Sequence, residues 1–562
     1  MSSAVMHETK SHPKQHSVLG TWNLFTSIEK RNIAIYIAGI MLYKFGLEAF
    51  NGSIVALATN RYDNDAKMSG TRAQTFFKVG LLTGLNQAFQ CVGSILIAPL
   101  IKRWPTKMVL SMAILVFGIL TAILLIVDAS TGGYIKPAGW DKTHKKDDWS
   151  YYGSYNTDGI IPIYCITGIA YGMVELIRRV IPRDIVGGNV QKLRRMDAMV
   201  HIFYEIAGTS GAFCTALALI PRLGNNMSFI ITPICFTLAS ITWWFISHLN
   251  FQRPLASVMS GKPMYIKAVL GGFYLFGESV WVGAKIIFTS RKFIWLVPGY
   301  SFALYGHRYL ENGIGPVIAR RYLGNSAWSQ IMVGGSNFGE LLGALFVFLF
   351  TNLVPTPIPW LRLDALLLLI VWWLPGWWPP VGRVQDAWVV AATFIPISFG
   401  WAAGDVSLAA YIQALLQRKE SEDNDVSPLG AVMAFLYCTY IVIYAISSST
   451  IGRYIDRIGA ENTNNFARGI VAAPGYPDKY INVRSAVQNI GGVQFTIIAA
   501  VIIAATFIPK GSFSFNPKNL YGETLQGESS TEYLVSGPKQ QSDEEVADVE
   551  KDEKKQVDAH AV

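Results

Sequence analysis

The sequence has little charge for its length. Only 15% of its 562 residues are Asp, Glu, Lys or Arg, and 51% are hydrophobic, whereas soluble domains average about 25% charged residues. About 20 apolar residues in a helix span the hydrocarbon core of a bilayer, and the sequence contains many runs of this kind. We therefore predict an all-α, polytopic membrane protein.

Motifs of several enzyme classes are missing. The sequence has no Walker A loop, no Gly-x-Ser-x-Gly turn and no His-Glu-x-x-His pair, which argues against an ATP-driven pump, a serine hydrolase and a zinc protease. Five cysteines lie in apolar runs without metal-ligand spacing, at positions 91, 165, 214, 235 and 438, so no disulfide framework is indicated. We predict no enzymatic activity, no cofactor and no metal site.

The net charge of +9 does not indicate a nucleic acid partner, because much of the excess lies in short loops, where Lys and Arg set membrane topology. The loop with Lys102, Arg103 and Lys107 belongs in the cytosol by this rule, and so do both termini. Residues 1–30 lack the apolar segment of a cleavable signal peptide. We favour the plasma membrane over the vacuolar membrane as the location.

The apolar runs predict twelve spanning helices in two sets of six. They lie near 32–58, 75–101, 107–128, 158–179, 199–220 and 225–248, and near 293–318, 327–354, 361–378, 386–412, 429–451 and 485–509. The predicted parts are a cytosolic segment (1–30), two six-helix bundles (31–248 and 293–510), a central cytosolic loop (249–292) and a disordered cytosolic tail (511–562). Charges interrupt the apolar residues 265–290, so we predict an interfacial helix there.

A pattern in the first half returns in the second. YKFGLEAFNG (43–52) and YGHRYLENG (305–313) each carry a cation, then a Glu, then Asn-Gly, inside apolar runs that both close on Arg-Tyr. Two similar membrane halves are typical of secondary transporters, whose site lies between the repeats near the middle of the bilayer. Charges at that depth are costly, so each is a functional candidate.

This organisation resembles the major facilitator superfamily, which has six plus six helices, a cytosolic central loop and cytosolic termini. The resemblance implies that the loop after the second helix takes part in gating. In GSILIAPLIKRWPTKMVL, which Gly93 opens, Arg103 and Lys107 match basic positions of the family's motif, but Lys102 stands where the family has an Asp. In the family that Asp helps to close the cytosolic gate through ion pairs. The resemblance implies that this chain cannot make the same closure from this position, because Lys102 has the opposite charge.

Residues 451–457 (IGRYIDR) resemble the motif more closely, yet they follow the eleventh predicted helix, and we interpret them as a helix-end feature. Segments 181–213 and 322–345 resemble an uncharacterised fungal branch of the superfamily. No substrate follows from that resemblance.

Four charges of the repeated pattern are the first site candidates. Lys44 and Glu48 are four residues apart, and Arg308 and Glu311 are three apart, so each pair shares a helix face. The first and seventh helices face the central cavity in the resembled fold, which implies that these residues do too. The alternative is that each pair only neutralises itself, although aliphatic residues would then be less costly.

Three further carboxyl groups lie deep in apolar runs. Glu205 and Glu340 have no obvious partner on their own helices, and Asp405 lies among small residues that would let a ligand approach. Burial favours the neutral form of a carboxyl group, and proton coupling requires a change between the two forms. A hydrogen-bonded packing role is the alternative. Asn86 and Asn337 either bind solute or hydrogen-bond between helices.

The sequence therefore predicts a secondary active transporter that moves a small polar or charged solute through the bilayer by alternating access, coupled to protons. The predicted solute contacts are Lys44, Arg308, Asp405, Asn86 and Asn337, and the candidates for proton binding are Glu48, Glu205, Glu311 and Glu340. Two alternatives stay open: an exporter of lipophilic or toxic compounds, and a transporter-like membrane sensor that signals through its C-terminal tail.

Overall fold

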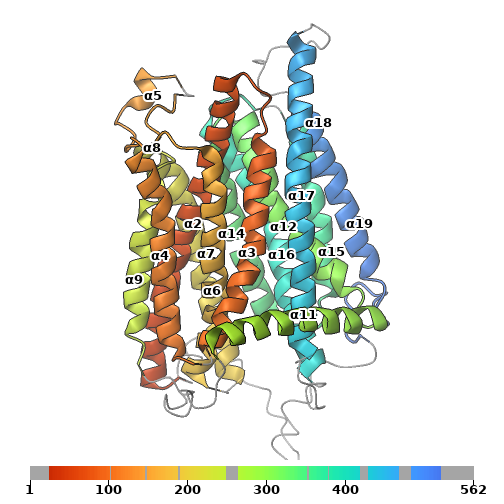
Figure 1. Ribbon diagram of the computed structural model, residues 1–562. Coiled ribbons are helices and arrows are strands. Elements are labelled where there is room, and N and C mark those ends of the chain that lie inside the picture. The colour runs from red at the N-terminus through yellow and green to blue at the C-terminus, as the bar shows by residue number, and fades with distance from the viewer. Residues whose placement is uncertain are drawn as a thin grey trace, which may run out of the picture.

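The computed structural model describes residues 25–101, 103–145, 148–187, 190–247, 264–350, 353–377, 379–417, 428–467 and 483–520. Figure 1 shows long helices side by side, with the loop that carries α5 (Trp140–Thr143) at one end of the bundle and α11 (Tyr265–Thr289) at the other. We call these two ends of the bundle the α5 end and the α11 end.

The N-terminal half begins with α2 (Ser27–Ser69). Its start is set by a capping box, in which Thr26 Oγ1 accepts a hydrogen bond from the Glu29 amide (3.2 Å) and the Glu29 carboxylate accepts one from the Thr26 amide (2.8 Å). The half continues with α3 (Thr75–Ile101), α4 (Thr106–Ser130), η1 (Thr157–Gly159) with α6 (Ile160–Val186), α7 (Val190–Cys214) with η2 (Thr215–Leu219) and α8 (Ile220–Leu223), and η3 (Ser228–Ile230) with α9 (Ile231–Trp244).

The C-terminal half begins with a stack of short α and π turns that carries the second copy of the repeated pattern. This α12 stack consists of η4 (Val297–Phe302), α12 (Ala303–Tyr309), η5 (Leu310–Ile314), α13 (Gly315–Val317) and η6 (Ile318–Tyr322). Then follow η7 (Ser326–Trp328) with α14 (Ser329–Phe350), α15 (Ile358–Leu368) with η8 (Leu369–Gly376), α16 (Val384–Gln417), α17 (Pro428–Ala467), and α18 (Arg484–Val487) with η10 (Gln488–Gln494) and α19 (Phe495–Ala505). Since π turns are frequent at functional sites, the α12 stack is a natural place for one.

Nine helices in the described residues are long and apolar enough to cross a membrane, which confirms the predicted helical membrane protein. The predicted spans 225–248, 293–318 and 327–354 correspond to α9, the α12 stack and α14, which are helical but do not belong to the nine. The count of twelve therefore stays a prediction. The helix-end interpretation of 451–457 is wrong, because α17 continues to Ala467; hydropathy does not show where a helix ends once it has left the apolar region.

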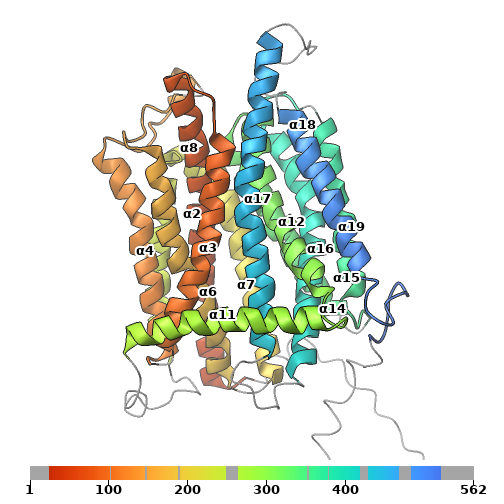
Figure 2. The ribbon, with the colours of Figure 1, turned by 45° about the vertical axis from the view of Figure 1, so that its right-hand side comes forward.

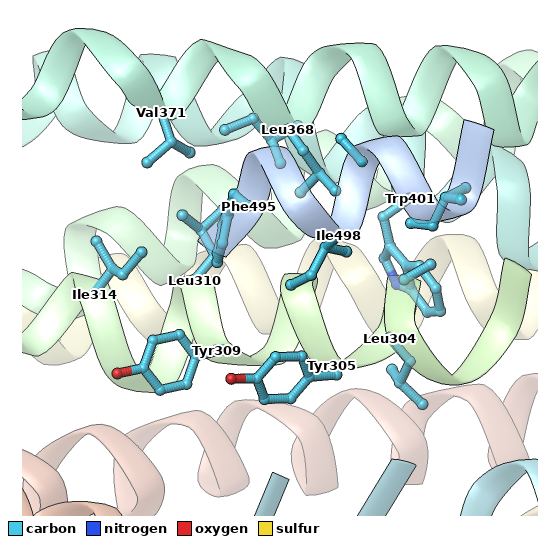
Figure 3. Close-up of a cluster of buried hydrophobic side chains, with 14 of the residues drawn as sticks. Leu304, Tyr305, Tyr309, Leu310, Ile314, Leu368, Val371, Trp401, Phe495 and Ile498 are labelled. Carbon is cyan, nitrogen blue, oxygen red and sulfur yellow. The ribbon is translucent and has the colours of Figure 1, made fainter. Parts of the chain in front are cut away.

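Each half has its own apolar core. In the C-terminal half, Leu310 of the α12 stack points toward Leu368 of α15 and Ile498 of α19, whereas Tyr305 and Tyr309 point to the opposite side (Figure 3). On that side Tyr309 lines a small cavity together with residues of α3 and α17. One side of the stack is thus packed within its own half, and the other faces the first half.

α11 runs across the bundle instead of along it, as Figures 1 and 2 both show. It contacts both halves: Tyr265 donates a hydrogen bond to the Leu96 carbonyl of α3 (3.0 Å), and a Cβ on Gly283 would lie 2.1 Å from the Ala431 carbonyl of α17. Large apolar side chains on it, such as Trp281, are exposed. This is the orientation that an interfacial helix requires.

Candidate functional site

Lys44 and Glu48 of α2 form a buried ion pair. Lys44 Nζ is 2.5 Å from Glu48 Oε1, and each side chain is 10% exposed. Lys44 also lies over the ring of Tyr204 on α7, 4.6 Å from its centroid, a distance suited to cation–π attraction. One helical turn separates the two charges, so the spacing in the sequence already predicts their contact.

A second ion pair meets the same tyrosine. Arg178 Nη2 is 2.6 Å from Glu175 Oε2 on α6, and the Arg178 guanidinium lies 4.5 Å from the Tyr204 centroid. Tyr43 of α2 donates a hydrogen bond to Glu175 (3.0 Å). Tyr204 therefore contacts cations from two helices. Nothing in the sequence pattern singles out this ring, because its partners come from α2 and α6.

The C-terminal half carries a denser cluster. Arg308 Nη1 is 2.9 Å from Glu311 Oε2, and His307 Nε2 is 2.7 Å from Glu340 Oε1 on α14. His307 Nε2 is also 3.6 Å from Glu311 Oε1, so the imidazole lies between two carboxylates. His307, Glu311 and Glu340 are 1%, 4% and 9% exposed. Both glutamates are among the predicted site residues, whereas the histidine is not.

Neighbouring side chains hold this cluster in place. Ser336 donates a hydrogen bond to Glu311 Oε1 (2.6 Å), and its hydroxyl lies 2.6 Å from that of Ser398 on α16. The His307 ring stacks on Trp401, with centroids 5.5 Å apart. Ser336 is four residues before Glu340, so helical spacing could have found it. Ser398 and Trp401 come from another helix, and no local signal points to them.

The clusters of the two halves meet at α7. Glu205 is 2% exposed, and its electrostatic neighbours include Lys44 in its own half and Glu340 in the other. Gly208, about one turn further, lets the halves approach: a Cβ there would lie 2.4 Å from Lys44 Cε and 3.1 Å from Asn337 Nδ2. Within the described residues, Glu205 Oε2 and Asn337 Nδ2 are buried without a hydrogen-bond partner. Two unsatisfied polar atoms thus face one interface.

The structure brings most of the predicted site residues together and leaves Asn86 and Asp405 apart from them. Asn86 donates to the Tyr164 carbonyl (2.7 Å) and accepts from Gln90 (2.9 Å), which fits the predicted alternative of hydrogen bonding between helices. Asp405 is an electrostatic neighbour of Asp364, a buried residue of α15 that in turn neighbours His307. The contact of Asp405 with the solute stays a prediction.

The predicted gating loop contacts its own half and α11. A Cβ on Gly93 would lie 1.9 Å from the Ile169 carbonyl of α6, so glycine is required for this crossing. Lys107 donates to the Ile246 carbonyl (2.7 Å), and Arg103 lies 5.9 Å from the Tyr265 ring of α11. Lys102 lies outside the described residues. A gating role for this loop stays a prediction.

An ion-pair cluster joins the halves at the α5 end. Asp63 of α2 lies 2.7 Å from Arg320 Nε and 2.8 Å from Arg321 Nη2, both on η6. Thr75 donates to the same carboxylate (2.5 Å). Arg321 belongs to the Arg-Tyr pair that closes the second copy of the repeated pattern. Arg61, its counterpart, stays within its own half and donates to the Gly153 carbonyl (2.9 Å).

A second contact at the α5 end involves the motif-like segment 451–457. Asp456 of α17 accepts hydrogen bonds from the Phe76 and Phe77 amides (3.2 and 2.9 Å) in the first turn of α3, where the helix dipole favours a negative charge. A Cβ on Gly452 would lie 2.1 Å from the Phe76 carbonyl. The segment thus joins the halves at the end opposite the loop where the family motif is expected.

No protein-family model and no curated protein matches the sequence. Solved structures do match. The chain resembles a point mutant of the nucleoside transporter NupG, at TM-score 0.54 and 12% identity over 85% of this chain and 100% of that one. It also resembles the peptide transporter POT in complex with sulfate (TM-score 0.53, 12% identity, 85% and 95% covered) and a D-xylose–proton symporter (0.51, 11%, 88% and 99%).

The chain has the major facilitator fold. At these identities the likeness shows the fold alone. It confirms the predicted fold class, and with the nine apolar helices of the described residues it identifies an integral, multi-pass membrane protein. None of these comparisons supports the expected fungal branch.

Proposed function

We propose that this protein is a secondary active transporter that moves a small polar or charged solute by alternating access and couples this movement to protons. The observation that carries the proposal is one buried site shared by both halves. Lys44 and Glu205 of the first half meet Asn337 and Glu340 of the second around Gly208. Charges at membrane depth mark solute and ion pathways, and transporters of this type bind solutes between their repeats.

Solute binding is assigned to Lys44, Arg308 and Asn337. Both cations are paired with carboxylates on their own helices, so a charged or polar group of the solute would exchange for one of these contacts. Asn337 Nδ2 lacks a partner within the described residues and would donate to a solute oxygen. A buried donor without a partner costs about 1–3 kcal/mol, which favours occupation of the site.

Proton binding is assigned first to Glu205. One of its carboxyl oxygens has no hydrogen-bond partner in the described part of the chain, and a buried carboxylate without full pairing is costly. Taking up a proton removes that cost and lets the halves move with a neutral group between them. Glu48, Glu311 and Glu340 are each paired, so they are the secondary candidates.

The test is charge movement in proteoliposomes on a solid-supported membrane. Amino acids, organic acids, polyamines, sugars and nucleosides are presented at two pH values. One solute class should give a current that depends on pH. Glu205→Gln should bring the ratio of the currents at the two pH values close to one, because an amide cannot take up and release the proton.

Asp158→Asn is the matched control, because Asp158 is a carboxylate at the α5 end whose partner Lys78 (2.6 Å) lies in the same half. It should keep the current of the unaltered protein. Silence across the panel from folded protein would contradict transport that moves net charge with any of these solute classes. A Glu205→Gln variant with unchanged pH dependence would contradict the proton assignment alone.

A further inference from the structure

Three atoms that could ligate a metal converge in the C-terminal cluster. His307 Nε2 and one carboxylate oxygen each from Glu311 and Glu340 lie within 4.8 Å of one another. No other group of three His, Cys, Asp or Glu side chains converges in this way among the residues that the structure describes. The three side chains come from consecutive turns of the α12 stack and from α14, which are packed helices and not loops.

We propose that His307, Glu311 and Glu340 bind a divalent transition-metal ion of the zinc class. One imidazole nitrogen and two carboxylate oxygens suit Zn²⁺, Fe²⁺ or Mn²⁺ better than Ca²⁺ or Mg²⁺, which prefer oxygen ligands alone. Three protein ligands leave a fourth position open for water or for the solute. The inference concerns the site of the proposed function, but binding of the ion can be measured without transport.

The observed distances are close to those of a metal site. His307 Nε2 lies 2.7 Å from Glu340 Oε1 and 3.6 Å from Glu311 Oε1. With ligand bonds near 2.1 Å, the ligand atoms of a tetrahedral zinc site lie about 3.4 Å apart. The imidazole and the Glu340 carboxylate would separate by about 0.7 Å to reach this spacing, and the ion would replace the hydrogen bond between them.

Glu311 can ligate without losing its ion pair. Its Oε2 atom accepts a hydrogen bond from Arg308 Nη1 (2.9 Å). The Oε1 atom, which faces His307, accepts one from the Ser336 hydroxyl (2.6 Å). Arg308 and Ser336 therefore hold the carboxylate with one oxygen turned toward the imidazole. Such supporting contacts orient ligands before an ion arrives.

His307 is also prepared for ligation. Its ring stacks on Trp401, and Nδ1 is buried without a hydrogen-bond partner in the described part of the chain. Only neutral imidazole ligates a metal, and its second nitrogen then carries the proton. Nδ1 can hold that proton here, which leaves Nε2 free for the ion.

Carboxyl groups outnumber permanent cations around the cluster. The charged and titratable neighbours of the cluster are Lys44 on α2, Tyr171 on α6, His201 and Glu205 on α7, Asp364 on α15, and Tyr440 and Tyr444 on α17, besides Arg308 of the cluster itself. Glu48 and Asp405 lie one step further, as neighbours of Lys44 and Asp364. In a low-dielectric site this excess must be neutralised by protons or by a bound cation. A divalent ion would therefore compete with protons, and its affinity should fall as the pH falls.

The test is a Co²⁺ titration of the full chain in detergent, followed by visible absorption, with Zn²⁺ as competitor. The purification tag must contain no histidine, because His7, His12 and His16 offer further nitrogen ligands. His307→Gln and Glu340→Gln should each weaken Co²⁺ binding at least about tenfold, as expected for loss of a ligand. His201→Gln, a histidine of α7 outside the three ligands, should bind like the unaltered protein. Thermal unfolding confirms that each variant is folded.

Two results would overturn the inference: no saturable Co²⁺ spectrum from the unaltered chain, or equal affinity in His307→Gln. Affinity should drop about tenfold per pH unit for each proton displaced, and a pH-independent affinity would contradict competition with protons. If solute moves in the presence of a chelator and no ion binds, the inference fails and the proposed function stands. If Zn²⁺ binds and no solute in the panel moves, the proposed function fails and the inference stands.

Discussion

Three buried ion pairs of this protein form within one helical turn. Lys44 with Glu48, Arg178 with Glu175 and Arg308 with Glu311 are all local pairs. A local pair can form as soon as its helix forms, so each helix carries little net charge into the bilayer. Glu340 instead pairs with His307 of the α12 stack, and Glu205 lies where the two halves meet.

At this scale we predict that Lys44→Met destabilises the protein more than Lys44→Met combined with Glu48→Leu. The single change leaves a carboxylate buried and unpaired, at a cost of roughly 3–5 kcal/mol, whereas replacing both partners with apolar residues is often nearly neutral. Thermal unfolding measures the difference, with a thiol-reactive dye that reports exposure of the buried free cysteines Cys165 and Cys235.

The matched control is Lys136→Met. Lys136 pairs with Asp141 (2.7 Å), whose side chain is 71% exposed, and exposed pairs contribute about 0–1 kcal/mol. If the double variant unfolds as readily as Lys44→Met, the cause of the destabilisation is loss of the ion pair and not the unpaired carboxylate that the single change leaves behind.

Among the helices, α3 and α17 show how closely the halves approach. A Cβ on Gly80 of α3 would lie 2.1 Å from the Ser448 carbonyl of α17, and one on Gly452 would lie 2.1 Å from the Phe76 carbonyl of α3. Backbones this close need glycine at the contact, as small residues allow in membrane helices generally. The closeness also lets Asp456 reach the first amides of α3.

We predict that Gly452→Ala destabilises this contact by about 1–3 kcal/mol, the usual cost of adding an atom to a closely packed position. Thermal unfolding is the measurement. Gly459→Ala lies on the same helix, and there a Cβ would meet only Val483, at 3.5 Å, so it should be nearly neutral. Equal effects of the two variants would mean that helix propensity, and not the crossing, decides the outcome.

Considered as a whole, the molecule is joined across its halves at the α5 end. Asp63 forms ion pairs with Arg320 and Arg321, and Asp456 accepts hydrogen bonds from two backbone amides of α3. Under alternating access these contacts must break when the site opens toward the α5 end, because both cross from one half to the other. They therefore belong to one of the two states that the proposed mechanism requires.

We predict that Asp63→Asn favours opening at the α5 end. Without the carboxylate, Arg320 and Arg321 repel each other across a partly buried contact. The probe is a cysteine in place of Thr83, which lines the small cavity between α3 and α17, in a background without the five native cysteines. In Asp63→Asn this cysteine should react several-fold faster with a membrane-impermeant thiol reagent. Asp158→Asn, at the same end but paired within one half, should leave the rate unchanged; unchanged labelling in Asp63→Asn would contradict the role of this contact.

Patterns along the chain are enough to predict the helices, the fold class and the contacts that lie within one turn. Apolar runs and i to i+4 spacing are local properties, so Lys44–Glu48 and Arg308–Glu311 follow from the order of residues alone. Which charges meet across helices depends on the packing of the folded chain. His307 reaches Glu340 over 33 residues, Arg321 reaches Asp63 over 258 and Asp456 reaches Phe76 over 380. Those contacts depend on where glycines let two helices cross, and a pattern along one chain does not contain that geometry.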